Sequence, residues 1–228
     1  MCYYATTNSI RWKGAYEYRV KSSRNSFQPA ELQFAKLLGC VLCTHLVEEN
    51  VLFVEFFTVT PLTYYHKSSS TKLKCRLMPY IFSVACEASE KGLPVMRAMF
   101  LEFPDDPGCD YLDRQYMLGD SLLVAPVFSP EGDVDYYLPP GKWVSFFTSA
   151  VVDGGRWVHE QHGYMSLPLL VRGNSIIAMG QEDSVPDYDY ADDVTFHVFE
   201  LDDNHAAVAE VHGPSGDLEM SLELTRQG

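Results

Sequence analysis

The stretch YLDRQYMLGDSLLVAPVF (residues 111–128) marks the point at which the sequence changes from helical to β character. Its second half holds short apolar runs rich in Leu and Val. The residues after it continue as short apolar segments broken by Gly, Pro, Asn and Asp. Short strands separated by turns at regular spacing are typical of a β-sandwich. The sequence therefore predicts an all-β region from about residue 116 onward.

Two segments of this region have the pattern of strand, turn and strand. In VDYYLPPGKWVSFF (134–147) the turn is PPGK, and in GYMSLPLLVRGNSIIAMG (163–180) it is RGN. Turn residues between two apolar runs favour a β-hairpin, so we expect the two strands of each segment to be neighbours. Two more strands are expected at 194–201 and 218–224.

An acidic segment, DSVPDYDYADD (183–193), precedes those last two strands. A cluster of Asp side chains could form a calcium loop, but this one lacks the ligand spacing of an EF-hand. We interpret it as a solvated connection.

Upstream of the β region, residues 72–91 have the period of a helix. Apolar side chains recur there at steps of three and four residues, at Leu73, Leu77, Tyr80, Ile81, Val84, Ala85 and Ala88. Gly92 and Pro94 are stop signals for this helix. Pro79 lies inside the pattern, so we expect a kink or a break there. The run PVMRAMFLEF (94–103) that follows is suited to a buried strand.

Composition excludes several classes of protein. The chain has 228 residues, 46% of them hydrophobic, and a formal net charge of −14. Residues 1–96 carry 11 basic and 7 acidic side chains, whereas 97–228 carry 6 and 24. Such an excess of carboxylates argues against binding to nucleic acid. No apolar run reaches the 18 residues of a membrane-spanning helix, so we expect no membrane partner, and the first residues do not have the pattern of a signal peptide.

Six cysteines are scattered among apolar neighbours, which favours free thiols and an intracellular location, although the compartment itself is not fixed by the sequence. Cys40 and Cys43 have CxxC spacing with His45 close behind, but a structural zinc site needs four ligands and no second pair exists. We interpret this motif as part of an apolar core or helix.

Carboxylates gather around the turn-rich residues 103–111: Glu102, Asp105, Asp106, Asp110, Asp113 and Asp120. They could form an acid/base pair or a metal site, but Asp beside Pro and Gly more often caps a turn by bonding its own backbone. A Ser/His/Asp triad around His159 or His162 has no GxSxG motif to support it. Trp143 and Trp157 could stack on a sugar, although Trp in a sandwich is more often a core or edge residue.

Four motifs in succession carry a resemblance: KLKCRLMPY (72–80), MRAMFLEFPDDP (96–107), the opening stretch (111–128) and YLPPGKW (137–143). Together they resemble glycoside hydrolase family 31, in particular its α-xylosidase branch, in the C-terminal part of the enzymes. The resemblance implies a fold that is mainly β with an N-terminal α part: the last helix of a (β/α)8 barrel, then a β-sandwich and the start of a second one.

The same resemblance implies four regions. Residues 1–71 are divergent, and we expect them to be poorly ordered or mis-translated, because 59–71 interrupts a helix with a Pro and a Ser run. Residues 72–116 are expected to be a remnant of the barrel C-terminus, 117–181 the proximal β-sandwich and 182–228 a truncated distal β-sandwich.

The resemblance implies an enzyme that hydrolyses α-xylosides without a cofactor, using two carboxylates about 5–5.5 Å apart. In the family both are Asp on mid-barrel strands, and residues 1–71 hold no counterpart of either motif and are too few for a barrel of about 250 residues. We therefore assign no catalytic, cofactor-binding or metal-binding residue, and expect the chain to be inactive alone. The alternative is a non-catalytic carbohydrate- or protein-binding module, or a gene remnant. The oligomeric state is not indicated.

Overall fold

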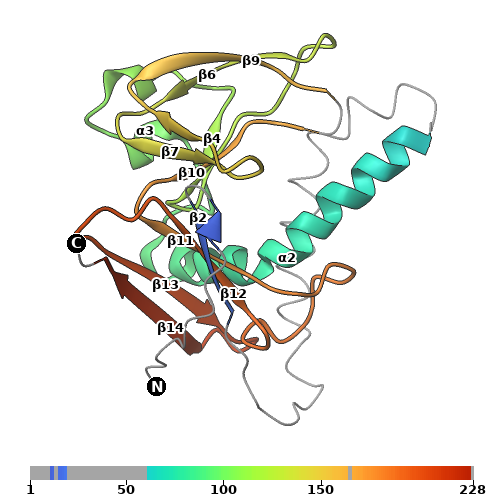
Figure 1. Cartoon of the computed structure of the whole chain (residues 1–228), viewed down its shortest axis with the longest axis vertical. Helices are drawn as coiled ribbons and strands as arrows, with labels where there is room; N and C mark the ends of the chain where they lie inside the picture. The colour runs from blue at the N-terminus through green and yellow to red at the C-terminus, as the bar shows by residue number, and fades with distance from the viewer. Residues whose placement is uncertain (1–10, 13–14, 20–60, 164–165, 227–228) are drawn as a thin grey trace.

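The computed structural model describes residues 11–12, 15–19, 61–163 and 166–226, with side chains from residue 70 onward (Figure 1). The predicted fold class is confirmed: the described chain is mainly β, with one long helix ahead of the main series of strands. The helices are α2 (Pro61–Lys91) and α3 (Met99–Glu102), with a 3-10 turn at Pro107–Cys109. The strands are β1 (Arg11–Trp12), β2 (Ala15–Arg19), β3 (Met96–Arg97), β4 (Tyr116–Leu118), β5 (Leu122–Val124), β6 (Asp133–Leu138), β7 (Lys142–Ser145), β8 (Val151–Asp153), β9 (Arg156–Gln161), β10 (Leu169–Arg172), β11 (Ser175–Met179), β12 (Thr195–Phe199), β13 (Ala206–His212) and β14 (Leu218–Thr225).

The first β layer pair lies at the top of Figure 1. A six-stranded sheet has the order β3-β4-β5-β10-β7-β8, and the antiparallel pair β6–β9 lies over one of its faces. Between them is a core that includes Met117, Leu123, Tyr136, Leu138 and Trp143. The alternation of buried and exposed residues along β6 follows from its having one face on this core and one face in solvent.

The second layer pair consists of a four-stranded sheet, β1-β2-β12-β11, and the pair β13–β14. Phe196, Val198, Val211 and Met220 lie in the core between them. β11 is buried along its whole length because both of its faces are covered. Its even residues contact this core, and its odd residues, such as Ile177, contact the six-stranded sheet and α2.

Helix α2 packs against both layer pairs. Leu77, Tyr80, Ile81 and Val84 join the core that faces the six-stranded sheet, whereas Met78 joins the core of the second layer pair. This placement explains the predicted apolar period over 72–91. The start of the helix was predicted too late, because α2 begins at Pro61 rather than at residue 72. Proline is well suited to the first position of a helix, where its missing N–H is not needed.

Pro79 lies inside α2 without breaking it, and the ribbon changes direction part-way along its length (Figure 1). A proline cannot donate to the carbonyl four residues earlier, here that of Cys75. That carbonyl accepts a hydrogen bond from the Tyr188 hydroxyl at 2.7 Å, and the next carbonyl, of Arg76, accepts one from the Gly180 N–H at 2.8 Å. The segment after β11 therefore satisfies the carbonyls near the proline.

The acidic segment 183–193 is thus more than a solvated connection. Tyr190 is 5% exposed and lies in the second core, where its ring packs against that of Tyr188. Asp side chains alternate with these two tyrosines along the chain. The acidic composition of the segment therefore gave no sign that its tyrosines attach it to the core.

Both predicted hairpins are wrong in their pairing. β6 pairs with β9, while β7 pairs with β8 and β10. β10 pairs with β5 and β7, while β11 pairs with β12. In both places the turn carries the chain from one sheet to another. The turn at 139–142 is closed by the Trp143 indole, whose Nε1 donates to the Pro139 carbonyl at 2.8 Å.

The run 94–103 is also not one strand. It forms the two-residue strand β3 and then the short helix α3. A fully extended chain would place Arg97 and Glu102 about 17 Å apart, at about 3.4 Å per residue. The helical turn brings them together instead, and their side chains form an ion pair at 3.0 Å.

None of the helices in the part of the chain that the structure describes is long and apolar enough to cross a membrane. The CxxC motif at Cys40 and Cys43, with His45, and most of the divergent segment 1–71 lie outside the described residues. Within that segment, β2 pairs with β12 along its full length.

Candidate functional site

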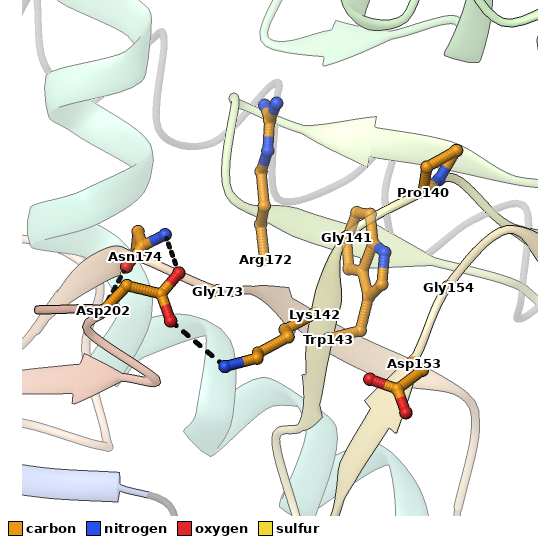
Figure 2. Close-up of a pocket in the computed structure, with 10 residues that line it drawn as sticks. All are labelled: Pro140, Gly141, Lys142, Trp143, Asp153, Gly154, Arg172, Gly173, Asn174 and Asp202. Carbon is orange, nitrogen blue, oxygen red and sulfur yellow. Dashed lines mark hydrogen bonds and ion pairs between the residues drawn. The ribbon is translucent and has the colours of Figure 1, made fainter. Parts of the chain in front are cut away.

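A pocket of about 570 Å³ lies where the two layer pairs meet (Figure 2). Four separate segments line it: the turn before β7, the end of β8, the crossing between β10 and β11, and the loop after β12. Its lining residues are Pro140, Gly141, Lys142, Trp143, Asp153, Gly154, Arg172, Gly173, Asn174 and Asp202. Trp143, which is only 1% exposed, belongs to the core beneath and forms a wall.

Asp202 is the most connected carboxylate of the pocket. It accepts a hydrogen bond from Asn174 Nδ2 at 3.0 Å, and its own N–H donates to Asn174 Oδ1 at 2.7 Å. Lys142 Nζ forms an ion pair with Asp202 at 3.1 Å. The hydrogen bonds from Asn174 and Lys142 lower the pKa of Asp202. The hydrogen bond between Lys142 and Asp202 also raises the pKa of Lys142. This contact holds the turn before β7 against the loop after β12.

The conformation of Asn174 explains its place in the pocket. Its φ is +63°, a left-handed value that Asn tolerates because its short side chain bonds locally. Its N–H donates to the carbonyls of Phe199 and Glu200. The chain can therefore turn from β10 into β11 while the side chain faces Asp202.

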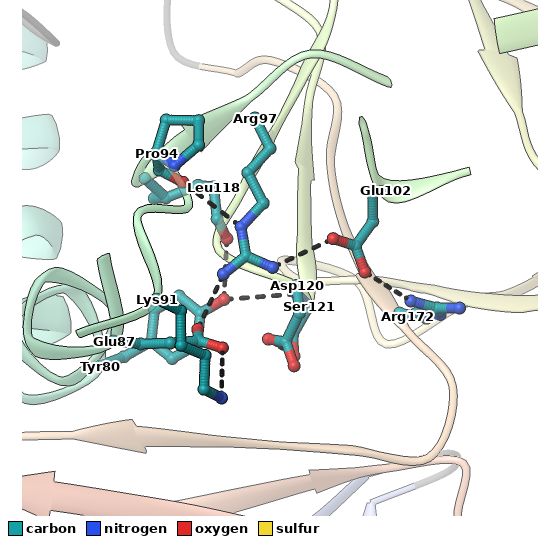
Figure 3. Close-up of polar contacts among 10 residues, drawn as sticks. All are labelled: Tyr80, Glu87, Lys91, Pro94, Arg97, Glu102, Leu118, Asp120, Ser121 and Arg172. Atoms are coloured by element: carbon teal, nitrogen blue, oxygen red, sulfur yellow. Dashed lines mark hydrogen bonds and ion pairs between the residues drawn. The ribbon is translucent and has the colours of Figure 1, made fainter. Parts of the chain in front are cut away.

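Arg172 connects the pocket to a second polar network (Figure 3). Its guanidinium forms an ion pair with Glu102 at 3.1 Å and lies 4.9 Å from the centre of the Phe103 ring. Glu102 also accepts from Arg97, which pairs in turn with Glu87 of α2 at 2.7 Å. Glu102 is therefore held between two guanidinium groups.

Tyr80 makes a separate set of hydrogen bonds near this network (Figure 3). Its hydroxyl donates to the Leu118 carbonyl at 2.7 Å and accepts from the Ser121 N–H at 3.3 Å. Burial raises the pKa of Tyr80 far above its usual value, with a further contribution from Asp120, so the phenol stays protonated. Gly119, at φ +67°, lets the backbone pass so close that a Cβ there would lie 2.3 Å from the Tyr80 hydroxyl oxygen.

The carboxylates that the sequence groups together do not meet in one site. Asp106 caps the 3-10 turn by accepting from Gly108 N–H at 2.9 Å, and it accepts from the Tyr137 hydroxyl at 3.1 Å. Asp120 accepts from Ser121 Oγ. Asp105, Asp110 and Asp113 are exposed. The interpretation as turn caps thus holds for Asp106, and no group of three or more metal-ligating side chains occurs in the described residues.

His162 is the one candidate that the structure places in a triad-like line. Its Nδ1 lies 3.0 Å from Ser166 Oγ, and its Nε2 lies 2.9 Å from Glu160. In a serine hydrolase the serine faces Nε2 and the acid faces Nδ1, the reverse of this order. Ser166 is exposed and the described pocket lies elsewhere, so this line stabilises the end of β9 and does not form a catalytic site.

His159 and Trp157 lie on the exposed face of β9. His159 Nδ1 is 2.8 Å from Asp135 Oδ1, and the side chains are exposed. This hydrogen bond raises the pKa of His159. Trp157 is 62% exposed, unlike Trp143, so only one of the two tryptophans is open to a ligand.

Two family models match the chain. The C-terminal domain of glycosyl hydrolase family 31 matches residues 92–177, and the C-terminal domain of α-xylosidase YicI matches residues 189–228. The matched regions correspond to the first layer pair together with most of β11, and to the larger part of the second.

Known proteins agree with these matches. The α-xylosidase XylQ of Lactiplantibacillus pentosus is 41% identical over 146 residues, which are 61% of this chain and 19% of the relative. An α-xylosidase of Emericella nidulans is 44% identical over 113 residues, 46% of this chain and 14% of the relative. The solved structure of the family 31 dextranase FjDex31A of Flavobacterium johnsoniae, complexed with glucose, is 30% identical, with a TM-score of 0.55 over 64% of this chain and 18% of that one.

The chain spans about a fifth of the length of these relatives or less. The matched residues build the first layer pair, line the pocket, and build the second layer pair except for β1, β2 and the end of β11. Residues 92–177 are therefore a C-terminal domain of glycoside hydrolase family 31, residues 189–228 match the C-terminal domain of α-xylosidase YicI, and the chain is similar to α-xylosidases.

Proposed function

We propose that this chain is the C-terminal β-sandwich region of an α-xylosidase-like enzyme, and that it braces a (β/α)8 catalytic barrel without hydrolysing glycosidic bonds itself. The observation that supports this proposal is the packing of α2 against both layer pairs. The motif at residues 72–80 resembles the last helix of the family's barrel, and the helix that contains it is buried against two cores. A scaffold of this kind would fix that helix at the barrel edge.

The polar groups of the described residues support a structural role. Lys142 and Asp202 neutralise each other, and Glu102 lies between Arg97 and Arg172. A retaining glycosidase needs one carboxylate free to attack and a second free to give and take a proton. Asp202 and Glu102 are instead paired with cationic side chains, and these ion pairs hold neighbouring elements together.

The first test is an assay of the purified chain on chromogenic α-xylosides and α-glucosides. We expect no release of chromophore above the protein-free blank, because the reaction needs two carboxylates in one cleft. Lactiplantibacillus pentosus XylQ is the positive control for the α-xyloside. Turnover that co-purifies with this chain, at a constant specific activity, would show that the proposal is wrong.

A complementation assay tests the bracing role directly. XylQ lacking the region equivalent to residues 92–228 is expressed alone and together with this chain. We expect the truncated enzyme to regain solubility and α-xyloside hydrolysis only in the co-expression. Full activity of the truncated enzyme on its own would mean that this region does not brace the barrel.

A further inference from the structure

The solvent-exposed face of the β6–β9 pair has an unusual composition. Both strands lie on the outside of the molecule, at the top of Figure 1. Three cross-strand pairs point outward, at Asp133–Gln161, Asp135–His159 and Tyr137–Trp157, and we call these six residues the β6–β9 face. An aromatic pair thus lies at one end of the face and polar pairs lie beside it.

Tyr137 is fixed in place beside Trp157. Its hydroxyl donates to Asp106, and its backbone N–H and carbonyl both bond the side-chain amide of Gln115, at 2.7 and 2.8 Å. Gly108 lets the ring approach so closely that a Cβ there would lie 2.8 Å from it. A ring held by these contacts loses no further freedom when a ligand arrives.

Trp157 packs on this fixed ring. The two ring centres are 5.7 Å apart with an interplanar angle of 55°, a tilted aromatic pair. One edge of the indole is therefore supported, while 62% of the residue stays exposed. A single exposed aromatic residue needs no explanation. Trp157 differs, because its ring is supported by Tyr137 and has polar neighbours at a regular spacing, and this arrangement needs an explanation.

The polar pair next to the aromatic pair, Asp135–His159, is close enough to reach the rim of a ligand stacked on the indole. Successive outward pairs on a strand are about 7 Å apart. His159 and Asp135 are bonded to each other. The next pair, one step further from the indole, has the carboxylate of Asp133 and the amide of Gln161, whose Nε2 donates to the Glu131 carbonyl at 3.3 Å. These side chains supply both donors and acceptors.

We propose that the β6–β9 face binds a neutral saccharide, with one pyranose ring stacked on Trp157 and its hydroxyl groups bonded to the Asp135–His159 pair. A pyranose has an apolar C–H face and a rim of hydroxyl groups, which matches an aromatic ring beside polar pairs. The face has no Lys or Arg, so it does not attract phosphate or other anions. The Asp135 carboxylate at its centre also disfavours a protein partner, since interface cores are depleted of charge.

This inference does not depend on the proposed bracing role, because the face is complete within β6, β9 and the residues beneath them. Binding here requires no hydrolysis. The site is also separate from the pocket in Figure 2, which none of the six residues lines.

The test is saturation-transfer NMR of the full chain with xylotriose and with isomaltotriose, at concentrations on the order of 10 mM because one stacking residue gives weak binding. We expect saturation of sugar ring protons with the unaltered chain and a loss of about fivefold or more with Trp157→Ala. Phe147→Ala, which removes another half-exposed aromatic ring outside the face, is the matched control and should bind as the unaltered chain does. Thermal unfolding of each variant checks that it is folded.

A second variant, Asp135→Asn, removes a charge but keeps an acceptor, and should weaken the signal less than Trp157→Ala. Trigalacturonic acid, a charged analogue, should give no transfer. Equal transfer with Trp157→Ala, transfer to the charged analogue at the level of the neutral sugars, or no transfer to either neutral sugar would each overturn the inference. Chromatography of the sugars afterwards separates binding from hydrolysis, so shortened products would count against the bracing proposal alone.

Discussion

At the scale of single residues, Arg97 holds the corner between α2, β3 and α3. Its side chain is 4% exposed and forms ion pairs with Glu87 at 2.7 Å and Glu102 at 3.0 Å. The charged guanidinium can be buried here because its N–H groups donate to two carboxylates and to the backbone carbonyl of Pro94. The sequence around Arg97 resembles the family, but it does not identify the two partners of this side chain. They come from a helix and from a turn that was predicted to be extended.

Replacing Arg97 tests this corner. Arg97→Met leaves the carboxylates of Glu87 and Glu102 facing a buried apolar side chain, and we expect it to lower the unfolding free energy by about 2–4 kcal/mol at pH 7. Urea denaturation followed by circular dichroism measures the loss. The control is Lys91→Met, which removes an exposed partner of Glu87 and should cost less than about 0.5 kcal/mol. Equal losses for the two variants would contradict the assigned role.

The cost of Arg97→Met should also depend on pH. Partial burial alone would raise the pKa of Glu87, but the hydrogen bonds from Lys91 and Arg97 outweigh it and hold that pKa below its usual value. A carboxyl with a lowered pKa in the folded state contributes stability above its unfolded pKa, and this contribution is lost as the pH falls through the folded value. The difference between the unaltered chain and the variant should therefore shrink below about pH 4.

At the scale of elements, the sequence predicted where helices and strands lie better than how strands pair. The apolar period over 72–91 correctly located the buried face of α2, because packing on two cores requires that period. The PPGK and RGN turns wrongly predict hairpins, because a tight turn has the same sequence features whether the next strand returns beside the first or enters another sheet. The pocket escaped prediction for a related reason. Four segments far apart in sequence build it, and Asp202 shares no local motif with Arg172 or Lys142.

The proline in α2 gives an element-scale prediction. Tyr188→Phe removes only the hydroxyl that bonds the Cys75 carbonyl, and should cost about 1–2 kcal/mol of unfolding free energy. Pro79→Ala restores an N–H four residues after Cys75, which can donate to the same carbonyl. We therefore expect the cost of Tyr188→Phe to fall by at least half in the Pro79→Ala background. A double-mutant cycle of the four proteins measures this coupling, and strictly additive effects would show that the two groups do not share an acceptor.

At the scale of the whole molecule, β11 and α2 join the two layer pairs into one folding unit. The odd residues of β11 pack with the six-stranded sheet, and its even residues pack in the second core. Neighbouring residues of α2 are divided in the same way, with Leu77 in one core and Met78 in the other. The expected division at residues 181–182 falls after β11, a strand that pairs with β12 on the far side of that boundary. Loss of either core would therefore expose a surface of the other.

This continuity predicts that damage to the second core spreads to the first. Phe196→Ala creates a cavity beside Val198 and Val211, and we expect it to lower the unfolding free energy by about 3–5 kcal/mol. Because β11 is shared, hydrogen exchange should show the same loss of protection in β5, which lies in the six-stranded sheet, as in β13. Val208→Ala, on the exposed side of β13, is the control and should leave exchange in β5 unchanged. If Phe196→Ala speeds exchange in β13 while β5 keeps its protection, the two layer pairs unfold separately and the shared strand does not couple them.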